Sequence, residues 1–360
     1  MSQPRLWIPG PTYVRPEILA ACARPTIGHR GQKMKELISS IDTRLKLLFG
    51  TKQHVLVLTA SGSAAWEAAI RCGVLDKWCC ASNGAFSERW GRTGHDCGKQ
   101  TVEIDHNWGD GLHPNAIAEW IRGHKSLEAV AFVQNETSTG AFSNVPDIAS
   151  SVRQANKEAL IFVDCVSSLA GAPFQFDLWG IDLAIASSQK CVALPPGLAL
   201  VAMSDRFLER ARTVPARGYY LDLVRASEDW EKHQTPATPA VNLMYALDDQ
   251  LRYIENETIE ARIKRHNDMA DLVNDWANDR GFPSFVNELH RSPTTSCRVA
   301  NGLDISLFVK TLRAMGHEIS DGYGKLKGNT FRIGHMGDHS PGDVRALLAC
   351  ADVALREVRG

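Results

Sequence analysis

Short apolar runs alternate with longer helical patterns between about residues 54 and 205, and this alternation constrains the fold more than any other feature. Parallel strands need crossover connections, usually helices, and strands covered on both faces read as short apolar, β-branched runs. We expect strands at 54–59, 77–82, 101–106, 127–134, 160–166, 182–188 and 198–203. We expect helices at 63–72, 85–94, 114–122 and 146–156. The sequence therefore predicts an α/β fold with a mostly parallel seven-stranded sheet between helices.

A second, smaller unit is predicted after the proline-punctuated loop 234–241. The spacing then becomes helical through about Trp276, which predicts one long connecting helix. A strand at 295–300, a helix at 305–315, a strand at 330–333 and a closing helix at 341–358 should follow. We divide the chain into an N-terminal arm (1–20), a large domain (21–250), and the connecting helix with a small C-terminal α+β domain (251–360).

The charge balance and the apolar runs exclude several classes of protein. The 360 residues carry 40 basic and 41 acidic side chains, so no basic field exists to hold nucleic acid. The longest apolar stretch, Val192–Met203, contains two prolines and is shorter than the ~20 residues of a membrane span. The N-terminus lacks the apolar core of a secretion signal. We expect a cytoplasmic protein that binds neither membranes nor nucleic acids.

The nine cysteines are odd in number and show no Cys-x-x-Cys or zinc-site spacing. The sequence thus predicts neither a disulfide framework nor a structural metal. The cysteines read mainly as small buried apolar residues.

Reactive side chains gather where the expected strands end, at 59–63, 135–140, 164–168 and 187–190. Ligands of open α/β sheets bind at such carboxyl ends. At the first of them, Ser61, Ser63 and the backbone N–H groups of the following helix can hold a phosphate, or they can simply cap that helix.

Asp164 and Lys190 each follow a buried strand. A buried carboxylate needs a partner, although Asp164 can also cap a neighbouring helix. Burial lowers the pKa of a lysine and makes it a nucleophile toward carbonyl groups. Lys190 can instead bury only its stem and extend its ammonium group into water. Together, a phosphate-binding turn, a carboxylate and a lysine are what pyridoxal 5'-phosphate requires.

With these motifs the chain resembles the class V aminotransferases, a family of fold-type I pyridoxal-phosphate enzymes, and within it the alanine/serine-glyoxylate or pyruvate branch. The resemblance is carried by PGPT (9–12), GHR (28–30), SGSAAWEAA (61–69), NGAFSER (83–89), NETSTG (135–140), DCVSSLAG (164–171), SSQKCVALPPGLA (187–199), TPATPAV (235–241) and RIGHMG (332–337). It extends over nearly the whole chain, and DCVSS followed by SSQK and PPG is its most specific part.

The resemblance implies a role for each matching residue. Lys190 would form the Schiff base and move protons, and Asp164 would pair with the pyridine nitrogen. Thr137 would lie near the phenolic oxygen, and Phe86 would stack on the cofactor ring. The phosphate ligands would be Ser61, Gly62, Ser63 and Gln189.

Further roles concern the substrate and a second subunit. Arg332 would bind the substrate carboxylate, whereas on its own it reads as a surface arginine on a strand. Gly10 and His29 would lie over the site with the N-terminal arm. Thr235 and Thr238 would reach the phosphate of a neighbouring subunit, which implies a homodimer with shared active sites. Tyr219 and Tyr220 line the entrance or merely pack.

The implied activity is ping-pong transamination from a small amino acid such as alanine or serine to a 2-oxo acid such as glyoxylate or pyruvate. A phosphonate or pyridoxamine donor remains an alternative, as does a lyase or desulfurase of the same superfamily. A desulfurase would need a mobile nucleophilic cysteine, and Cys297 and Cys350 lie in segments predicted to be structured. A non-catalytic scaffold that keeps the fold is the alternative from another class.

Overall fold

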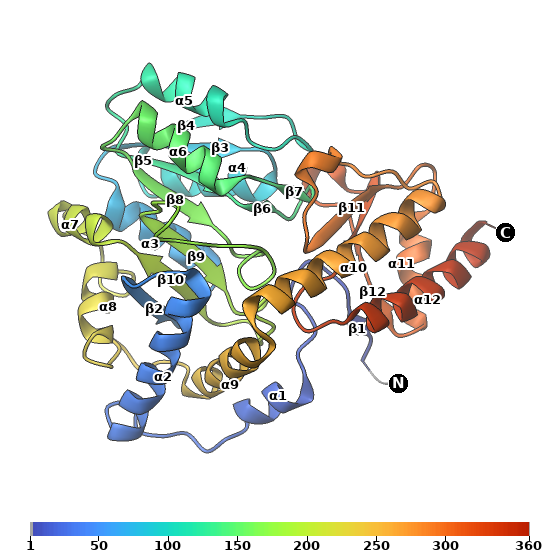
Figure 1. Ribbon diagram of the computed structural model, residues 1–360, viewed down its shortest axis with the longest axis horizontal. Coiled ribbons are helices and arrows are strands. Elements are labelled where there is room, and N and C mark those ends of the chain that lie inside the picture. Colours follow the sequence, from blue (N-terminus) through green and yellow to red (C-terminus); the bar gives the residue numbers. More distant parts are fainter. Residues whose placement is uncertain (1–2, 360) are drawn as a thin grey trace.

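The structure, a computed structural model, describes residues 3–359 and is built around a seven-stranded sheet (Figure 1). The strand order is β2-β10-β9-β8-β5-β3-β4. These strands are β2 (His54–Leu58), β3 (Lys77–Ser82), β4 (Gln100–Asp105), β5 (Ala129–Val133), β8 (Leu160–Asp164), β9 (Leu183–Ser187) and β10 (Ala199–Met203). Each overlaps one predicted strand, so the α/β fold with its mostly parallel sheet is confirmed.

One strand runs against the others. β10 pairs antiparallel with both β2 and β9, whereas the remaining pairs in this sheet are parallel. Every residue of β5, β8, β9 and β10 is buried, as expected for strands covered by helices on both faces. Because β10 is antiparallel to both neighbours, β2 and β9 point the same way. Their carboxyl ends therefore lie at the same edge as those of β3, β5 and β8.

The helices of this first unit include the four that were predicted. These are α3 (Gly62–Gly73), α4 (Ala85–Asp96), α5 (Pro114–Arg122) and α6 (Val145–Ala155). The sequence analysis did not predict α1 (Pro16–Cys22), α2 (Gln32–Phe49), α7 (Asp205–Thr213) or α8 (Leu223–Trp230). A small hairpin of β6 (Asn135–Glu136) and β7 (Ala141–Phe142) follows β5.

The predicted long connecting helix is wrong, because two helices occupy that segment. α9 (Val241–Glu257) ends at Thr258, and α10 (Ile259–Asp279) begins directly after it. Thr258 has φ +67°, outside the helical region, and its hydroxyl accepts a hydrogen bond from the backbone N–H of Ala261. A single residue therefore ends one helix and caps the next, while the apolar spacing continues across the break.

The C-terminal unit has a core of its own, in which Phe282, Phe308 and Phe331 pack edge to face. It contains β11 (Thr295–Val299), α11 (Ile305–Ala314), β13 (Ser320–Asp321), β14 (Thr330–Gly334), α12 (Pro341–Arg359) and two 3₁₀ turns, η1 (Glu288–His290) and η2 (Gly324–Leu326). Both predicted strands and both predicted helices are present. Asp343 accepts hydrogen bonds from the backbone and hydroxyl of Ser340, as expected at the start of the closing helix.

The N-terminal segment lies beside this C-terminal unit, although the two are far apart in sequence (Figure 1). β1 (Arg5–Leu6) pairs with β12 (His317–Glu318). The backbone N–H of Gly334 donates a hydrogen bond to the carbonyl oxygen of Trp7. The backbone N–H of Thr12 donates one to the carbonyl oxygen of Gln189. These contacts lead residues 8–11 across the carboxyl edge of the large sheet. Among the helices of residues 3–359, none is both long and apolar enough to cross a membrane.

Candidate active site

A cavity of about 230 Å³ lies at the carboxyl edge of the large sheet. Six segments that are distant in sequence contribute to it, namely the N-terminal segment and the residues at or after the ends of β2, β3, β5, β8 and β9. Its lining includes these predicted site residues: Gly10, Ser61, Gly62, Ser63, Phe86, Thr137, Asp164, Gln189 and Lys190. The fold thus gathers nine of the positions singled out by sequence in one place.

Lys190 follows β9 and extends into this cavity beneath the N-terminal segment. Its ammonium group donates a hydrogen bond to the carbonyl oxygen of Pro9. Burial, and then the positive charge of Arg332, lower the pKa of the Lys190 amine to about 8. The alternative in which the ammonium group reaches bulk water does not match this position. About a tenth of the amine is therefore neutral, and hence nucleophilic, at pH 7, far more than for an ordinary lysine.

Asp164 is the last residue of β8 and is 3% exposed. Its Oδ1 accepts a hydrogen bond of 2.7 Å from the backbone N–H of Val166, and its Oδ2 accepts one of 2.7 Å from the indole of Trp66. Burial raises the pKa of this carboxyl to about 7, while the two hydrogen bonds act in the opposite direction. The carboxylate does not cap a neighbouring helix. It lies on the cavity wall, where a cationic group would stabilise its charge.

The first turn of α3 forms another wall. Ser61 is the N-cap residue, but its side chain makes no capping hydrogen bond within the described chain, which leaves its hydroxyl available. Gly62 lies so close to β9 that a Cβ atom there would be 2.4 Å from the Ser187 hydroxyl. Among residues 3–359, Oγ of Ser187 and Oε1 of Gln189 are buried without a hydrogen-bond partner. Oε1 of Gln189 can only accept a hydrogen bond, whereas the Ser187 hydroxyl can donate one. A free hydroxyl donor beside a helix N-terminus marks a place where an anion can bind.

Phe86 lies in the first turn of α4, which a buried carboxylate holds in place. Glu136 accepts hydrogen bonds from the backbone N–H groups of Phe86 and Ser87 and from the hydroxyl of Ser138. The Phe86 ring stacks on Tyr323, with 5.2 Å between centroids. The aromatic ring is thus fixed on the cavity wall, 6.0 Å from the Lys190 amine.

Arg332 is 7% exposed, so it is not the surface arginine that its strand position alone suggests. Its Nη1 donates to the carbonyl oxygen of Thr137, and its Nε donates to that of Asp321, each at 3.2 Å. The guanidinium carbon lies 5.3 Å from the centre of the Tyr323 ring. β14 therefore places the arginine in contact with the backbone of Thr137, which lines the cavity, although Arg332 is not itself among the lining residues of the described chain.

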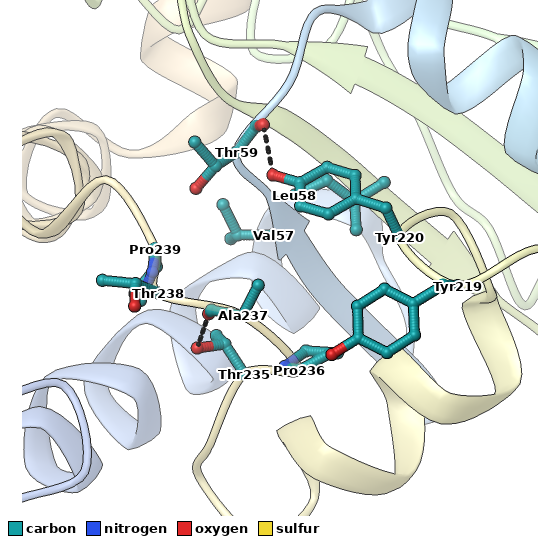
Figure 2. A pocket seen from close by; sticks show the side chains of 10 residues that line it. All are labelled: Val57, Leu58, Thr59, Tyr219, Tyr220, Thr235, Pro236, Ala237, Thr238 and Pro239. Atoms are coloured by element: carbon teal, nitrogen blue, oxygen red, sulfur yellow. Dashed lines mark hydrogen bonds between the residues drawn. The ribbon is translucent and has the colours of Figure 1, made fainter.

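Thr235 and Thr238 do not line the cavity that holds Lys190. They belong to a separate pocket with Thr59, Tyr219 and Tyr220 (Figure 2). Thr235 is 7% exposed and donates to the carbonyl oxygen of Ala237, whereas Thr238 is exposed to solvent. Tyr220 donates to the carbonyl oxygen of Thr59, two residues before Ser61. Within one chain these threonines thus lie outside the cavity that Ser61, Gly62 and Ser63 line.

His29 is another predicted residue that lies apart, in the segment between α1 and α2. It is not among the cavity-lining residues of the part of the chain that the structure describes. Its predicted role at the substrate therefore has no support from this arrangement.

Several cavity residues were missed by the sequence analysis, namely Trp66, Val133, Asn135, Val166, Ser167 and Ser187. A signal existed for Trp66, because it is three residues after Ser63 and four after Gly62 on the same helix face. Ser187 precedes Lys190 in the SSQK motif. Asn135, Val166 and Ser167 lie in the strand ends 135–140 and 164–168 that the sequence singles out, but they were given no role. Val133 is apolar and carries no chemical signal.

The aminotransferase class V family model matches residues 17–326. An uncharacterized aminotransferase of Methanocaldococcus jannaschii is 38% identical over 98% of this chain and 93% of its own length. The chain belongs to the class V aminotransferases. An L-aspartate–glyoxylate aminotransferase of Paracoccus denitrificans is 30% identical over 99% of this chain and 92% of its own length. The crystal structure of an alanine–glyoxylate aminotransferase from Nostoc superposes with a TM-score of 0.93 at 27% identity, covering 99% and 96% of the two chains.

Class V aminotransferases use pyridoxal 5'-phosphate, and the cavity residues fit that group. The Ser187 hydroxyl, which has no hydrogen-bond partner among residues 3–359, and the backbone N–H groups at the α3 N-terminus match a phosphate. The buried carboxylate of Asp164 matches a protonated ring nitrogen. The Lys190 amine matches an aldehyde. The phosphate, the ring nitrogen and the aldehyde of the cofactor would thus each find a suitable partner in one cavity.

Proposed function

We propose that this class V aminotransferase moves an amino group from a small amino acid, such as alanine or serine, to glyoxylate or pyruvate in two half-reactions. The observation that carries the proposal is the convergence of Lys190, Asp164 and the α3 N-terminus on one cavity. The names of the Paracoccus and Nostoc relatives support glyoxylate as an acceptor.

The proposed cofactor ligands follow from this convergence. The α3 N-terminus with Ser61, Gly62 and Ser63, together with Gln189, would bind the phosphate. Asp164 would hold the ring nitrogen, Phe86 would stack on the ring, and Thr137 would lie near the phenolic oxygen. When bound, pyridoxal 5'-phosphate supplies an aldehyde carbon that an amine attacks and a ring that withdraws electrons from it.

Lys190 is proposed as both the nucleophile and the proton carrier. With a pKa of about 8, its Nζ can accept the proton of the substrate α-carbon and later return it to a neighbouring atom. The N-terminal segment around Gly10 lies against this amine and shields it from solvent on that side. One group can therefore serve both directions of proton transfer.

Arg332 is proposed to bind the carboxylate that amino acids and 2-oxo acids share. A buried guanidinium offers a planar pair of donors, which suits a carboxylate better than a lysine does. His29 remains a proposed contact near the arm. We further propose a homodimer in which Thr238, and with it Thr235, contributes to the phosphate site of the other subunit.

The competing reactions have less support. A desulfurase needs a mobile, exposed thiol, but Cys297 lies in β11, is 2% exposed, and burial raises its pKa to about 11. Cys350 lies within α12. A scaffold would have no reason to keep a half-buried lysine with a lowered pKa beside a buried carboxylate.

The proposal is tested by half-reaction titration. Purified protein saturated with pyridoxal 5'-phosphate receives alanine, serine, aspartate, aminoethylphosphonate or pyridoxamine in turn, and the cofactor absorbance band is followed. We expect a band shift with at least one small amino acid and its reversal by glyoxylate or pyruvate. Responses confined to the phosphonate or pyridoxamine would support the alternative donors, and no response to any donor would favour the scaffold.

A further inference from the structure

The contact between Trp66 and Asp164 is a feature of the site that the proposed function does not use. The indole Nε1–H of Trp66 donates to Oδ2 of Asp164 at 2.7 Å, and both side chains are buried. The backbone N–H of Val166 holds the other oxygen, Oδ1. A carboxylate has about four lone-pair positions, so the two occupied positions leave about two free, which is enough for a further donor.

A row of tryptophans fixes the Trp66 indole in place. Trp66 stacks on Trp90 with 6.0 Å between centroids, and Trp90 in turn meets the edge of Trp78. Trp78 is anchored by its own hydrogen bond to the hydroxyl of Thr101. Among residues 3–359, the Trp90 Nε1 is buried without a hydrogen-bond partner. Trp90 is therefore held by ring packing alone, whereas Trp66 combines ring packing with a hydrogen bond to the buried carboxylate of Asp164.

We propose that Trp66 is a positioning residue, whose indole N–H keeps Asp164 ionised and aligned so that the carboxylate can hold a protonated cofactor ring nitrogen. The inference rests on the proposed function, because it concerns the same cofactor. It assigns to the sixth residue of SGSAAW a role that a phosphate-binding turn does not require.

The direction of the effect follows from the charges around Asp164. Burial penalises the ionised carboxyl, and the carboxylate of Glu136 acts in the same direction. The donors on Val166 and Trp66 and the ammonium of Lys190 oppose this effect. Removing the Trp66 donor should therefore raise the pKa of Asp164. A more readily protonated carboxyl is a weaker partner for a pyridinium nitrogen.

The test compares Trp66→Phe with Trp90→Phe. Both replacements remove one indole from the same stack, but only the first removes a hydrogen bond to Asp164. Each holoprotein is prepared with pyridoxal phosphate labelled with ¹⁵N in the ring, and the ¹⁵N chemical shift is followed from about pH 6 to about pH 9. In Trp66→Phe, we expect the ring nitrogen to lose its proton at a pH lower by about one unit or more. Wild type and Trp90→Phe should behave alike.

A second readout uses the cofactor-free proteins. The infrared band of the protonated Asp164 carboxyl, assigned by its loss in Asp164→Asn, should persist to higher pH in Trp66→Phe than in wild type or Trp90→Phe. If Trp66→Phe does not fold, β-(3-benzothienyl)alanine at position 66 replaces the N–H by sulfur in an isosteric ring and gives the same comparison.

Equal titration of the two variants in both readouts would overturn the positioning role. A wild-type protein that does not bind pyridoxal phosphate would instead overturn the proposed function. The infrared titration needs no cofactor, so the two failures are distinguishable.

Discussion

Arg262 of α10 and Asp338, four residues beyond β14, form an ion pair of 2.8 Å whose side chains are 2% and 5% exposed. The same guanidinium donates to the carbonyl oxygen of Cys191 at 2.8 Å, next to Lys190. Asp338 also accepts a hydrogen bond of 2.7 Å from Arg15 of the N-terminal segment. One buried pair therefore joins the C-terminal unit, the N-terminal segment and the lysine-bearing loop.

Removing only one partner of this ion pair should destabilise the protein. Arg262→Met leaves Asp338 buried with less compensation, so we expect a loss of about 3–5 kcal/mol in the free energy of unfolding. The double variant Arg262→Met/Asp338→Leu removes both charges and should recover part of that loss. Urea unfolding measures both values. A single variant as stable as wild type would show that the pair contributes nothing.

The lowered pKa of Lys190 predicts the pH dependence of its reactivity. Its pKa of about 8 lies below the 10.5 that is usual for a lysine, so the neutral amine should increase as the pH rises through about 8. At pH 7 about a tenth of the amine should be neutral. Competitive acetylation followed by mass spectrometry gives the midpoint. Arg332→Gln removes a positive charge and should move it to higher pH, whereas a midpoint near 10.5 in wild type would refute the argument.

The close approach of Gly62 to Ser187 predicts that added volume weakens cofactor binding. In Gly62→Ala, the new Cβ would lie 2.4 Å from the Ser187 hydroxyl, so one of the two must move. We expect pyridoxal phosphate to bind about tenfold more weakly or worse, as overpacking typically costs 1–3 kcal/mol. Gly28→Ala is the matched control, because within residues 3–359 nothing lies within 4 Å of its added Cβ. Equal affinities, measured by equilibrium dialysis, would place the phosphate elsewhere.

The separation of Thr238 from Lys190 predicts complementation between subunits. Thr238→Trp and Lys190→Ala should each abolish transamination as pure proteins. If Thr238 serves the neighbouring subunit, a mixed dimer holds one site with both residues intact, and up to about one quarter of wild-type activity should return after the two are mixed and allowed to exchange subunits. Persistent inactivity of verified mixed dimers would mean that both residues act within the same chain.

Much of the fold could be predicted because its signals are local. The seven strands of the large sheet are short apolar runs whose burial on both faces leaves a strong pattern, and each was predicted within two residues at either end. The break between α9 and α10 at Thr258 could not be predicted in this way. Thr258 breaks a continuous helical pattern through its own backbone conformation, and nothing in the apolar spacing marks that break.

In the candidate site, too, some residues could be predicted from the sequence and others could not. Lys190 and Asp164 could be predicted because reactive side chains directly after buried strands converge at one sheet edge. Tyr323 could not, since its stacking on Phe86 joins two residues of separate units. The unpaired Ser187 hydroxyl depends on how closely α3 approaches β9, which packing alone determines.

Chemical trapping of Lys190 tests the central claim most directly. The protein is incubated with pyridoxal phosphate, reduced with borohydride, digested and mapped by mass spectrometry. The proposed function predicts one pyridoxyl adduct, located on Lys190 and lost in Lys190→Ala. An adduct on another lysine, or none in wild type, would contradict it.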